Sequence, residues 1–127
     1  MALVLVVEDQ PENRDLMAYL LRAFGHEVDS AADGAEGLAA ARRRRPDLAV
    51  IDIQMPVMDG LQLVAALKAD PALASIPAVG VTAFAMVGDR DRILAAGFDG
   101  YLTKPIEATT FVGELEAFLP AADHPGE

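Results

Sequence analysis

The sequence predicts an α/β fold with a doubly wound parallel sheet, and three observations favour it. Short runs of mostly apolar residues, too short for helices, recur along the 127 residues. Each run is followed by a segment with helical periodicity, and such alternation is typical of parallel βαβ units. Polar side chains stand directly after the runs at Glu8-Asp9, Asp52 and Lys104. Ligands of open α/β sheets bind beyond these carboxyl ends of strands.

The five predicted strands are residues 3–7, 27–30, 48–51, 78–81 and 99–102. Continuous apolar runs are typical of strands that helices cover on both faces. The run at 48–51 is apolar throughout, so we expect it to be central.

The first predicted helix follows the first strand directly. Pro11 suits its first turn because a helix leaves the N–H of that residue without a partner. An apolar stripe then predicts the buried face, and Gly25 ends the helix. The stripe consists of Leu16, Leu20 and Phe24, reinforced by Met17 and Leu21.

The remaining helices begin at turn residues or follow strands after short loops. Asp33-Gly34 leads into an alanine-rich helix that ends near Arg45, and Asp59-Gly60 opens the third helix. A helix at about 86–96 ends at Gly97, and the last is expected at about 107–119. The apolar residues expected on these helices are Leu63, Val64 and Leu67, then Ile93 and Leu94, then Phe111, Leu115 and Phe118.

Right-handed, short crossovers leave few possible strand orders. The flavodoxin-like order 2-1-3-4-5, with five helices in a three-layer α/β/α arrangement, is one of the two common choices. It places the first strand beside the third, so Glu8, Asp9 and Asp52 are expected to converge. Three adjacent carboxylates repel one another unless a cation intervenes. The pattern therefore predicts a divalent metal, with Lys104 as a fixed positive charge, at a site that handles phosphate.

Composition restricts the class of protein. A net charge of −10 disfavours general nucleic-acid binding, and the absence of cysteine excludes disulfides. No signal or membrane-spanning pattern is present, so we expect a cytoplasmic protein without a membrane partner. The basic run 42–45 is interpreted as a solvated helix end. We expect one domain over residues 1–120 and a flexible tail over 121–127.

Four segments carry a resemblance to a known family. They are residues 6–9 (VVED), 52–60 (DIQMPVMDG), 81–83 (VTA) and 101–105 (YLTKP). Each lies at the end of a predicted strand, and together they resemble the receiver domain of bacterial response regulators, over about residues 3–119. This resemblance implies a phosphorelay signalling module of a two-component system rather than an enzyme.

The resemblance also implies roles for individual residues. Asp52 would accept a phosphoryl group from a histidine kinase or a histidine phosphotransfer protein. Mg²⁺ would be held by Glu8, Asp9, Asp52 and the backbone carbonyl of Gln54. Thr82 resembles the switch hydroxyl and Tyr101 the aromatic residue that moves with it, while Lys104 would pair with the phosphoryl group. Gly60 and Pro105 take structural positions, Pro105 resembling a proline after a cis peptide bond.

Two positions depart from the common pattern. Position 54 is Gln rather than the commoner Asn, which matters little if only the carbonyl binds metal. Phe84 is bulky at a position that, in the family, influences the access of water to the phosphoryl group. The lifetime of the phosphorylated state therefore stays open.

The output is expected to be a protein effector, reached through a face that phosphorylation remodels at the fourth helix and fifth strand. A homodimer through that face, or through the last helix, is also possible. A receiver module of a hybrid histidine kinase is an alternative to a stand-alone receiver.

The sequence disfavours three further functions. An aspartyl phosphatase commonly needs a second acid where this chain has Gln54. A flavin-binding electron carrier would need a phosphate-binding loop rich in Ser, Thr and Gly after the first strand, which this chain lacks. A receiver fold that works without phosphorylation is disfavoured because the matched site residues are all retained. His26 and His124 are expected to be structural or solvated rather than phosphoryl carriers.

Overall fold

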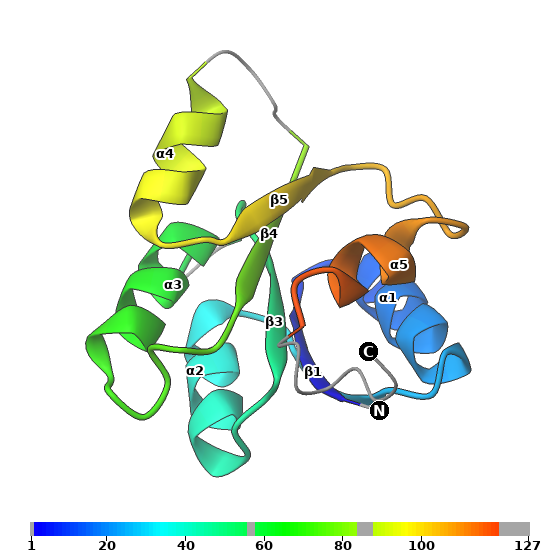
Figure 1. Ribbon diagram of the computed structural model, residues 1–127, viewed down its shortest axis with the longest axis horizontal. Helices are drawn as coiled ribbons and strands as arrows, with labels where there is room; N and C mark the ends of the chain where they lie inside the picture. Colours follow the sequence, from blue (N-terminus) through cyan, green and yellow to red (C-terminus); the bar gives the residue numbers. More distant parts are fainter. Residues whose placement is uncertain (1, 56–57, 84–87, 120–127) are drawn as a thin grey trace.

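A five-stranded parallel sheet lies between two layers of helices in the computed structural model, which describes residues 2–55, 58–83 and 88–119 (Figure 1). The strands are β1 Leu3–Val7, β2 Glu27–Ala31, β3 Leu48–Asp52, β4 Ala78–Thr82 and β5 Gly100–Thr103. The helices are α1 Pro11–Ala23, α2 Gly34–Arg43, α3 Gly60–Ala69, α4 Asp89–Ala96 and α5 Phe111–Glu116. The strand order is β2-β1-β3-β4-β5, and every neighbouring pair is parallel. The predicted fold class and strand order are confirmed.

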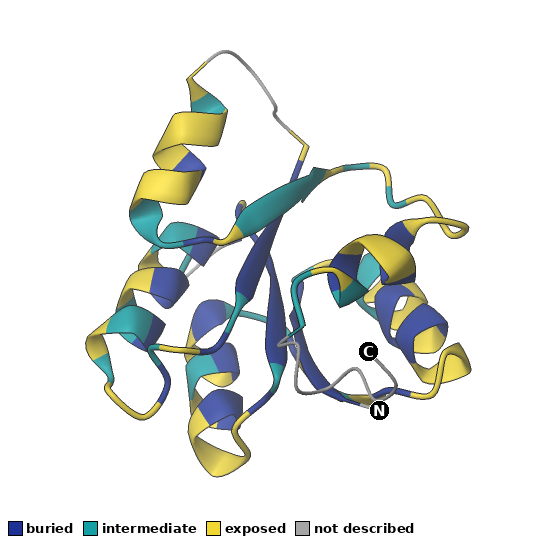
Figure 2. Cartoon of the chain, in the orientation of Figure 1, coloured by how far each residue is buried: buried dark blue, intermediate teal, exposed yellow. Residues whose placement is uncertain are grey.

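The two faces of the sheet carry separate cores. Helices α2, α3 and α4 cover one face, and α1 and α5 cover the other (Figure 1). The first core includes Ile51, Leu63, Val64, Leu67 and Ile93, and the second includes Val50, Met17, Leu21, Phe111 and Leu115. Strand β3 is buried along its whole length, as expected of a central strand (Figure 2).

The predicted apolar face of α1 was partly wrong. Leu16 and Phe24 are exposed, with 37% and 60% of their surface accessible to solvent. The buried face is formed instead by Met17, Ala18, Leu20 and Leu21. Two overlapping stripes satisfy the helical period here, and packing against the sheet selects the one that begins at Met17.

The two helices near the carboxyl end differ from the expected pattern. Helix α4 spans Asp89–Ala96, and its Ile93 is buried whereas Leu94 is exposed. Gly97 ends this helix with a left-handed φ of 119°, as predicted. Helix α5 covers only the middle of the expected 107–119 span. At its carboxyl end, turns with i→i+3 hydrogen bonds replace α-helical turns, as from the N–H of Phe118 to the carbonyl of Leu115.

Some expectations lie outside the described residues. These are the effect of Phe84, the start of the fourth helix near residue 86 and the tail beyond residue 119. Within the residues that the structure describes, no helix is long and apolar enough to cross a bilayer.

Candidate functional site

The carboxyl ends of the strands bring the predicted site residues together. Glu8 and Asp9 follow β1, and Asp52 ends the neighbouring β3. One ligand oxygen from each of these three acids lies within 4.8 Å of the others. The convergence predicted from the strand order is therefore present.

Asp52 is held through both of its carboxylate oxygens. The backbone N–H of Gln54 donates to Oδ1 over 3.1 Å, and the ammonium of Lys104 lies 3.2 Å from Oδ2. The side chain is almost fully buried. Gly60 supports this arrangement, because a Cβ there would lie 2.6 Å from the carbonyl oxygen of Asp52. A side chain at position 60 would therefore push the end of β3 away from helix α3.

Glu8 is the most deeply buried acid of the site. Its Oε2 accepts from the N–H of Gln10 over 3.1 Å, and Arg14 donates to its backbone carbonyl over 2.9 Å. Its Oε1 is buried without a hydrogen-bond partner among the described residues, although the ammonium of Lys104 lies 3.4 Å away. A buried carboxylate oxygen without a hydrogen bond costs free energy unless a ligand compensates it.

The ammonium of Lys104 contacts both buried acids. Its Nζ lies within salt-bridge distance of both Glu8 and Asp52. Its backbone N–H donates to the carbonyl of Thr82 over 2.8 Å, which fixes the start of this side chain beside the end of β4. The peptide bond between Lys104 and Pro105 is cis, as the resemblance implied.

The pKa values in the site reflect burial of like charges. Burial, reinforced by the facing Asp52 carboxyl, raises the pKa of Glu8 from 4.5 to about 7 against the opposing effects of the Gln10 N–H and Lys104. Burial also raises the pKa of Asp52, although contacts with Glu8 and Lys104 lower it. For Lys104, burial lowers the pKa, but the two carboxylates outweigh this and raise it. A proton between the two acids therefore favours Glu8.

These residues fit Mg²⁺. The ion prefers oxygen ligands and is commonly held by one or two carboxylates with several retained waters. The acids Glu8, Asp9 and Asp52 supply such oxygens within a short range of one another. The Oε1 of Glu8, which has no hydrogen-bond partner among the described residues, and the raised pKa values of Glu8 and Asp52 are what a carboxylate cluster shows when one ammonium only partly neutralises it.

The side chain of Gln54 is a site residue that the sequence alone did not reveal. Its Nε2 lies 3.1 Å from the hydroxyl oxygen of Thr82, and its Oε1 lies 3.4 Å from the same oxygen. Thr82 is almost fully buried at the end of β4. Its role as a switch was predicted from the motif, but its contact with Gln54 depends on how two adjacent strands end.

Tyr101 lies on β5 at the edge of the sheet. It is half-buried and packs against the core beneath α3 and α4. It also borders a surface hollow of about 390 Å³. The other residues that line this hollow are Arg90, Leu94, Asp99, Gly100 and Phe118.

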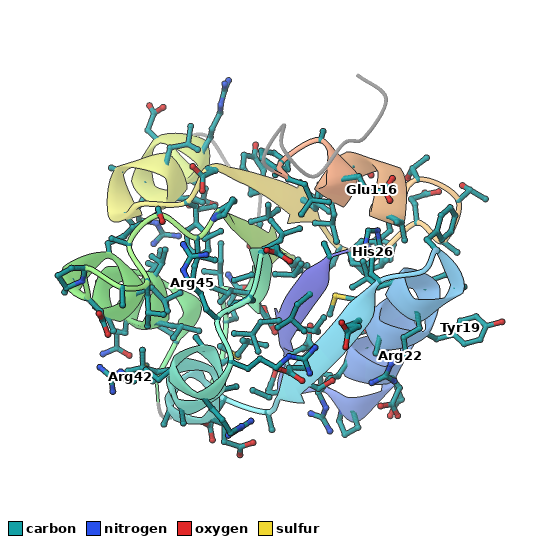
Figure 3. All side chains as sticks on the ribbon, turned by 60° about the horizontal axis from the view of Figure 1, so that its bottom comes forward. Tyr19, Arg22, His26, Arg42, Arg45 and Glu116 are labelled. Atoms are coloured by element: carbon teal, nitrogen blue, oxygen red, sulfur yellow. The ribbon has the colours of Figure 1, made fainter. Side chains whose placement is uncertain are left out.

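His26 lies away from the acidic site and has structural contacts. Its Nδ1 accepts from the N–H of Ala2 over 3.2 Å, so the ring proton is on Nε2, which lies 2.8 Å from Oε2 of Glu116 (Figure 3). The ring is buried between the start of β1 and helix α5. These contacts agree with the expectation that His26 is not a phosphoryl carrier, whereas His124 lies outside the described residues.

The basic run makes more contacts than its interpretation as a solvated helix end implied. Arg44 pairs with Glu27 over 2.6 Å, and Arg45 donates to the hydroxyl of Ser75 over 2.6 Å and to the carbonyl of Ala72 over 3.0 Å. The run ties the end of α2 to β2 and to the loop before β4.

Comparison with known proteins identifies the family of this site. The sequence model of the response regulator receiver domain matches residues 4–116. The chain belongs to this receiver family. The polar-differentiation response regulator DivK of Brucella anthropi is 41% identical over 116 residues, which are 91% of this chain and 94% of DivK.

Solved receiver structures share the fold of this receiver. Chemotaxis protein CheY4 of Vibrio cholerae superposes with a TM-score of 0.89 at 34% identity, covering 94% of this chain and 99% of CheY4. The receiver domain of sensor histidine kinase PA1611 from Pseudomonas aeruginosa PAO1 has a TM-score of 0.84 at 32% identity, covering 92% of this chain and 96% of that domain. That structure contains a magnesium ion coordinated in its active site cleft. The protein is therefore a receiver of two-component signalling, with an acidic cluster consistent with a Mg²⁺ site.

Proposed function

We propose that this receiver accepts a phosphoryl group on Asp52 from the phosphohistidine of a histidine kinase or a histidine phosphotransfer protein. The observation that carries the proposal is the setting of the Asp52 carboxylate. It is buried, held through one oxygen by Gln54 and through the other by Lys104, and lies within metal-ligand range of Glu8 and Asp9. Few structural roles need a carboxylate in such a position, because burying it among other acids is costly.

The proposed reaction transfers a phosphoryl group from a histidine nitrogen to the carboxylate of Asp52. A carboxylate oxygen of Asp52 forms a bond to phosphorus while the phosphorus–nitrogen bond of the phosphohistidine breaks, and the electron pair returns to the imidazole. The protein contributes position and charge, because phosphoryl transfer needs little covalent help. Lys104 holds the acceptor in place and supplies positive charge for the phosphoryl oxygens.

The proposed Mg²⁺ ligands are Glu8, Asp9, Asp52 and the backbone carbonyl of Gln54. When bound, Mg²⁺ would neutralise negative charge on the carboxylates and on the phosphoryl oxygens. The same groups would assist release of the receiver's own phosphoryl group rather than turnover of an external ester. Gln54 supports this distinction, because it stands where phosphatases with an aspartyl nucleophile commonly carry a second acid.

The proposed output is a change in the surface beside β5. A new acyl phosphate on Asp52 places acceptor oxygens near Thr82 and Lys104. We propose that Thr82 donates to one of them and that Tyr101 responds, which reshapes the hollow lined by Arg90, Leu94 and Phe118. This surface would then bind a protein effector or a second copy of the chain.

One alternative has a specific observation in its favour. The receiver domain of a sensor histidine kinase matches most of this chain at 32% identity. A receiver module of a hybrid histidine kinase would use the same acidic site, but its phosphoryl group would come from, or pass to, a histidine in the same assembly.

The proposal is tested by labelling with acetyl phosphate in the presence of Mg²⁺, followed by intact mass. The wild-type protein should gain one phosphoryl group, and Asp52→Asn should reduce labelling at least about 100-fold because amides are poor nucleophiles. Asp33→Asn is the matched control, because Asp33 caps α2 and Asn caps helices equally well. Unchanged labelling of Asp52→Asn, or labelling that persists when Mg²⁺ is chelated, would contradict the proposal.

A further inference from the structure

We propose that Gln54 is a positioning residue that holds the Thr82 hydroxyl in the resting protein, so that phosphorylation must replace this contact. The inference rests on the proposed function of Asp52 and names the interaction that opposes the switch. It concerns the side chain of Gln54, not the backbone carbonyl proposed as a metal ligand.

Gln54 contacts both ends of the proposed switch. Its backbone N–H donates to Oδ1 of Asp52 over 3.1 Å, which anchors the residue beside the phosphoacceptor. Its side-chain amide spans the hydroxyl of Thr82, with Nε2 at 3.1 Å and Oε1 at 3.4 Å. The two contacted residues lie on adjacent strands, since β3 pairs with β4.

The contact competes with the switch because a hydroxyl has a single hydrogen. When Thr82 donates that hydrogen to Oε1 of Gln54, it cannot donate it to a phosphoryl oxygen on Asp52. Thr82 is almost fully buried, so water does not readily take over one of these roles. Forming the phosphorylated state therefore includes the cost of breaking the Gln54–Thr82 contact.

The length of the Gln54 side chain matters for this contact. Asparagine is one carbon–carbon bond shorter, about 1.5 Å. An amide withdrawn by that distance would leave hydrogen-bond range of the Thr82 hydroxyl, which now lies 3.1 Å from Nε2. The Gln at position 54 therefore distinguishes this chain from receivers with the commoner Asn, where the sequence alone suggested a minor difference.

The test is a titration with beryllofluoride, a phosphoryl mimic, at saturating Mg²⁺, followed by the backbone amide resonances of Thr82 and Tyr101. Gln54→Met keeps the length and volume of the side chain but removes its hydrogen bonds. The apparent affinity for beryllofluoride should rise about fivefold, the value of one ordinary hydrogen bond. Gln54→Asn should shift the affinity in the same direction. Unchanged or weaker binding by Gln54→Met would overturn the inference.

Two controls separate this effect from a general change in the protein. Gln62→Met makes the same chemical change in the capping box of α3, so it should lower stability slightly and leave the affinity unchanged. In a Thr82→Val background the effect of Gln54→Met should vanish, because the partner hydroxyl is gone. An equal effect with and without the hydroxyl would also overturn the inference.

A measurement without metal or mimic tests the contact itself. In the metal-free protein, the Thr82 methyl resonance should shift in Gln54→Met and not in Gln62→Met. If wild-type protein binds no beryllofluoride, the proposed function of Asp52 fails. If it binds but Gln54→Met leaves the affinity and the Thr82 resonance unchanged, only the role of Gln54 fails.

Discussion

Two clusters of ionisable side chains lie at opposite ends of the sheet and differ in how completely their polar atoms are hydrogen-bonded. At the carboxyl ends of the strands, the acidic site (Glu8, Asp9, Asp52 and Lys104) leaves one Glu8 oxygen without a hydrogen bond among the described residues and has raised acid pKa values. At the amino ends, the basal pair of His26 and Glu116 gives each ring nitrogen of His26 a partner. The basal pair stabilises the fold, whereas the acidic site holds like charges close together, at the place where we propose that Mg²⁺ and a phosphoryl group bind.

This difference teaches how to separate structural charges from functional ones. Buried polar groups that serve stability are normally hydrogen-bonded by their own protein. A buried cluster that is incompletely satisfied, and whose pKa values are displaced by burial of like charges, is a candidate for ligand binding or chemistry. Variants of the two groups should therefore fail in different ways.

The largest effect is expected from Lys104→Ala. Asp52 should still accept a phosphoryl group from acetyl phosphate, but beryllofluoride with Mg²⁺ should no longer shift the resonances of Tyr101, because the charge that engages the phosphoryl group is lost. Lys68→Ala is the matched control, since that ammonium binds backbone carbonyls before β4. A Lys104→Ala protein that still switched normally would remove Lys104 from the mechanism.

The second-largest effect is expected in the pH dependence of the free energy of unfolding. The pKa of Glu8 lies at about 7 in the folded protein and at 4.5 ordinarily, so the folded state holds a proton that the unfolded chain releases. The contribution of Glu8 to the free energy of unfolding of the metal-free protein should be most favourable below about pH 4.5. It should fall as the pH rises toward about 7, by an amount on the order of a few kcal/mol.

Urea unfolding across this pH range, with and without Mg²⁺, measures the effect. Mg²⁺ binds the ionised carboxylates, so its stabilisation should grow as the pH rises. Glu8→Gln should flatten the metal-free profile and weaken the response to Mg²⁺. A metal-free wild type that became more stable between pH 5 and pH 7 would show that burial does not dominate the charge of this site.

The smallest effect is expected at the basal pair. His26→Ala removes the acceptor for the Ala2 N–H and the partner of Glu116, which should lower the free energy of unfolding by about 1–3 kcal/mol. Acetyl phosphate labelling of Asp52 should stay within twofold of wild type under conditions where the variant is folded. Loss of labelling in folded His26→Ala protein would contradict the separation of the two groups.

Much of the acidic site followed from sequence because its residues come directly after strands. Glu8, Asp9, Asp52 and Lys104 needed only a strand order to meet, and short right-handed crossovers left few orders. The structural position of Gly60 followed in the same way, from a turn residue that opens a helix. Tyr101 was placed correctly on the fifth strand, but its proposed response to phosphorylation stays a prediction.

The errors have a shared origin. Leu16 and Met17 both fit an apolar stripe on α1, and only contact with the sheet decides which one is buried. The segment after α5 forms turns because its hydrogen bonds span three residues, a difference from an α-helix that apolar periodicity in the sequence does not reveal.

The amino-acid sequence by itself determined the alternation of strands and helices, the family and which residues are proposed to carry the chemistry, because these depend on local pattern and on order along the chain. Tertiary structure alone decided which face of α1 is buried, how Gln54 contacts Thr82 and that His26 contacts Glu116. These contacts join side chains from separate elements, so their distances depend on how the helices and strands pack. The local sequence around each residue therefore does not predict them.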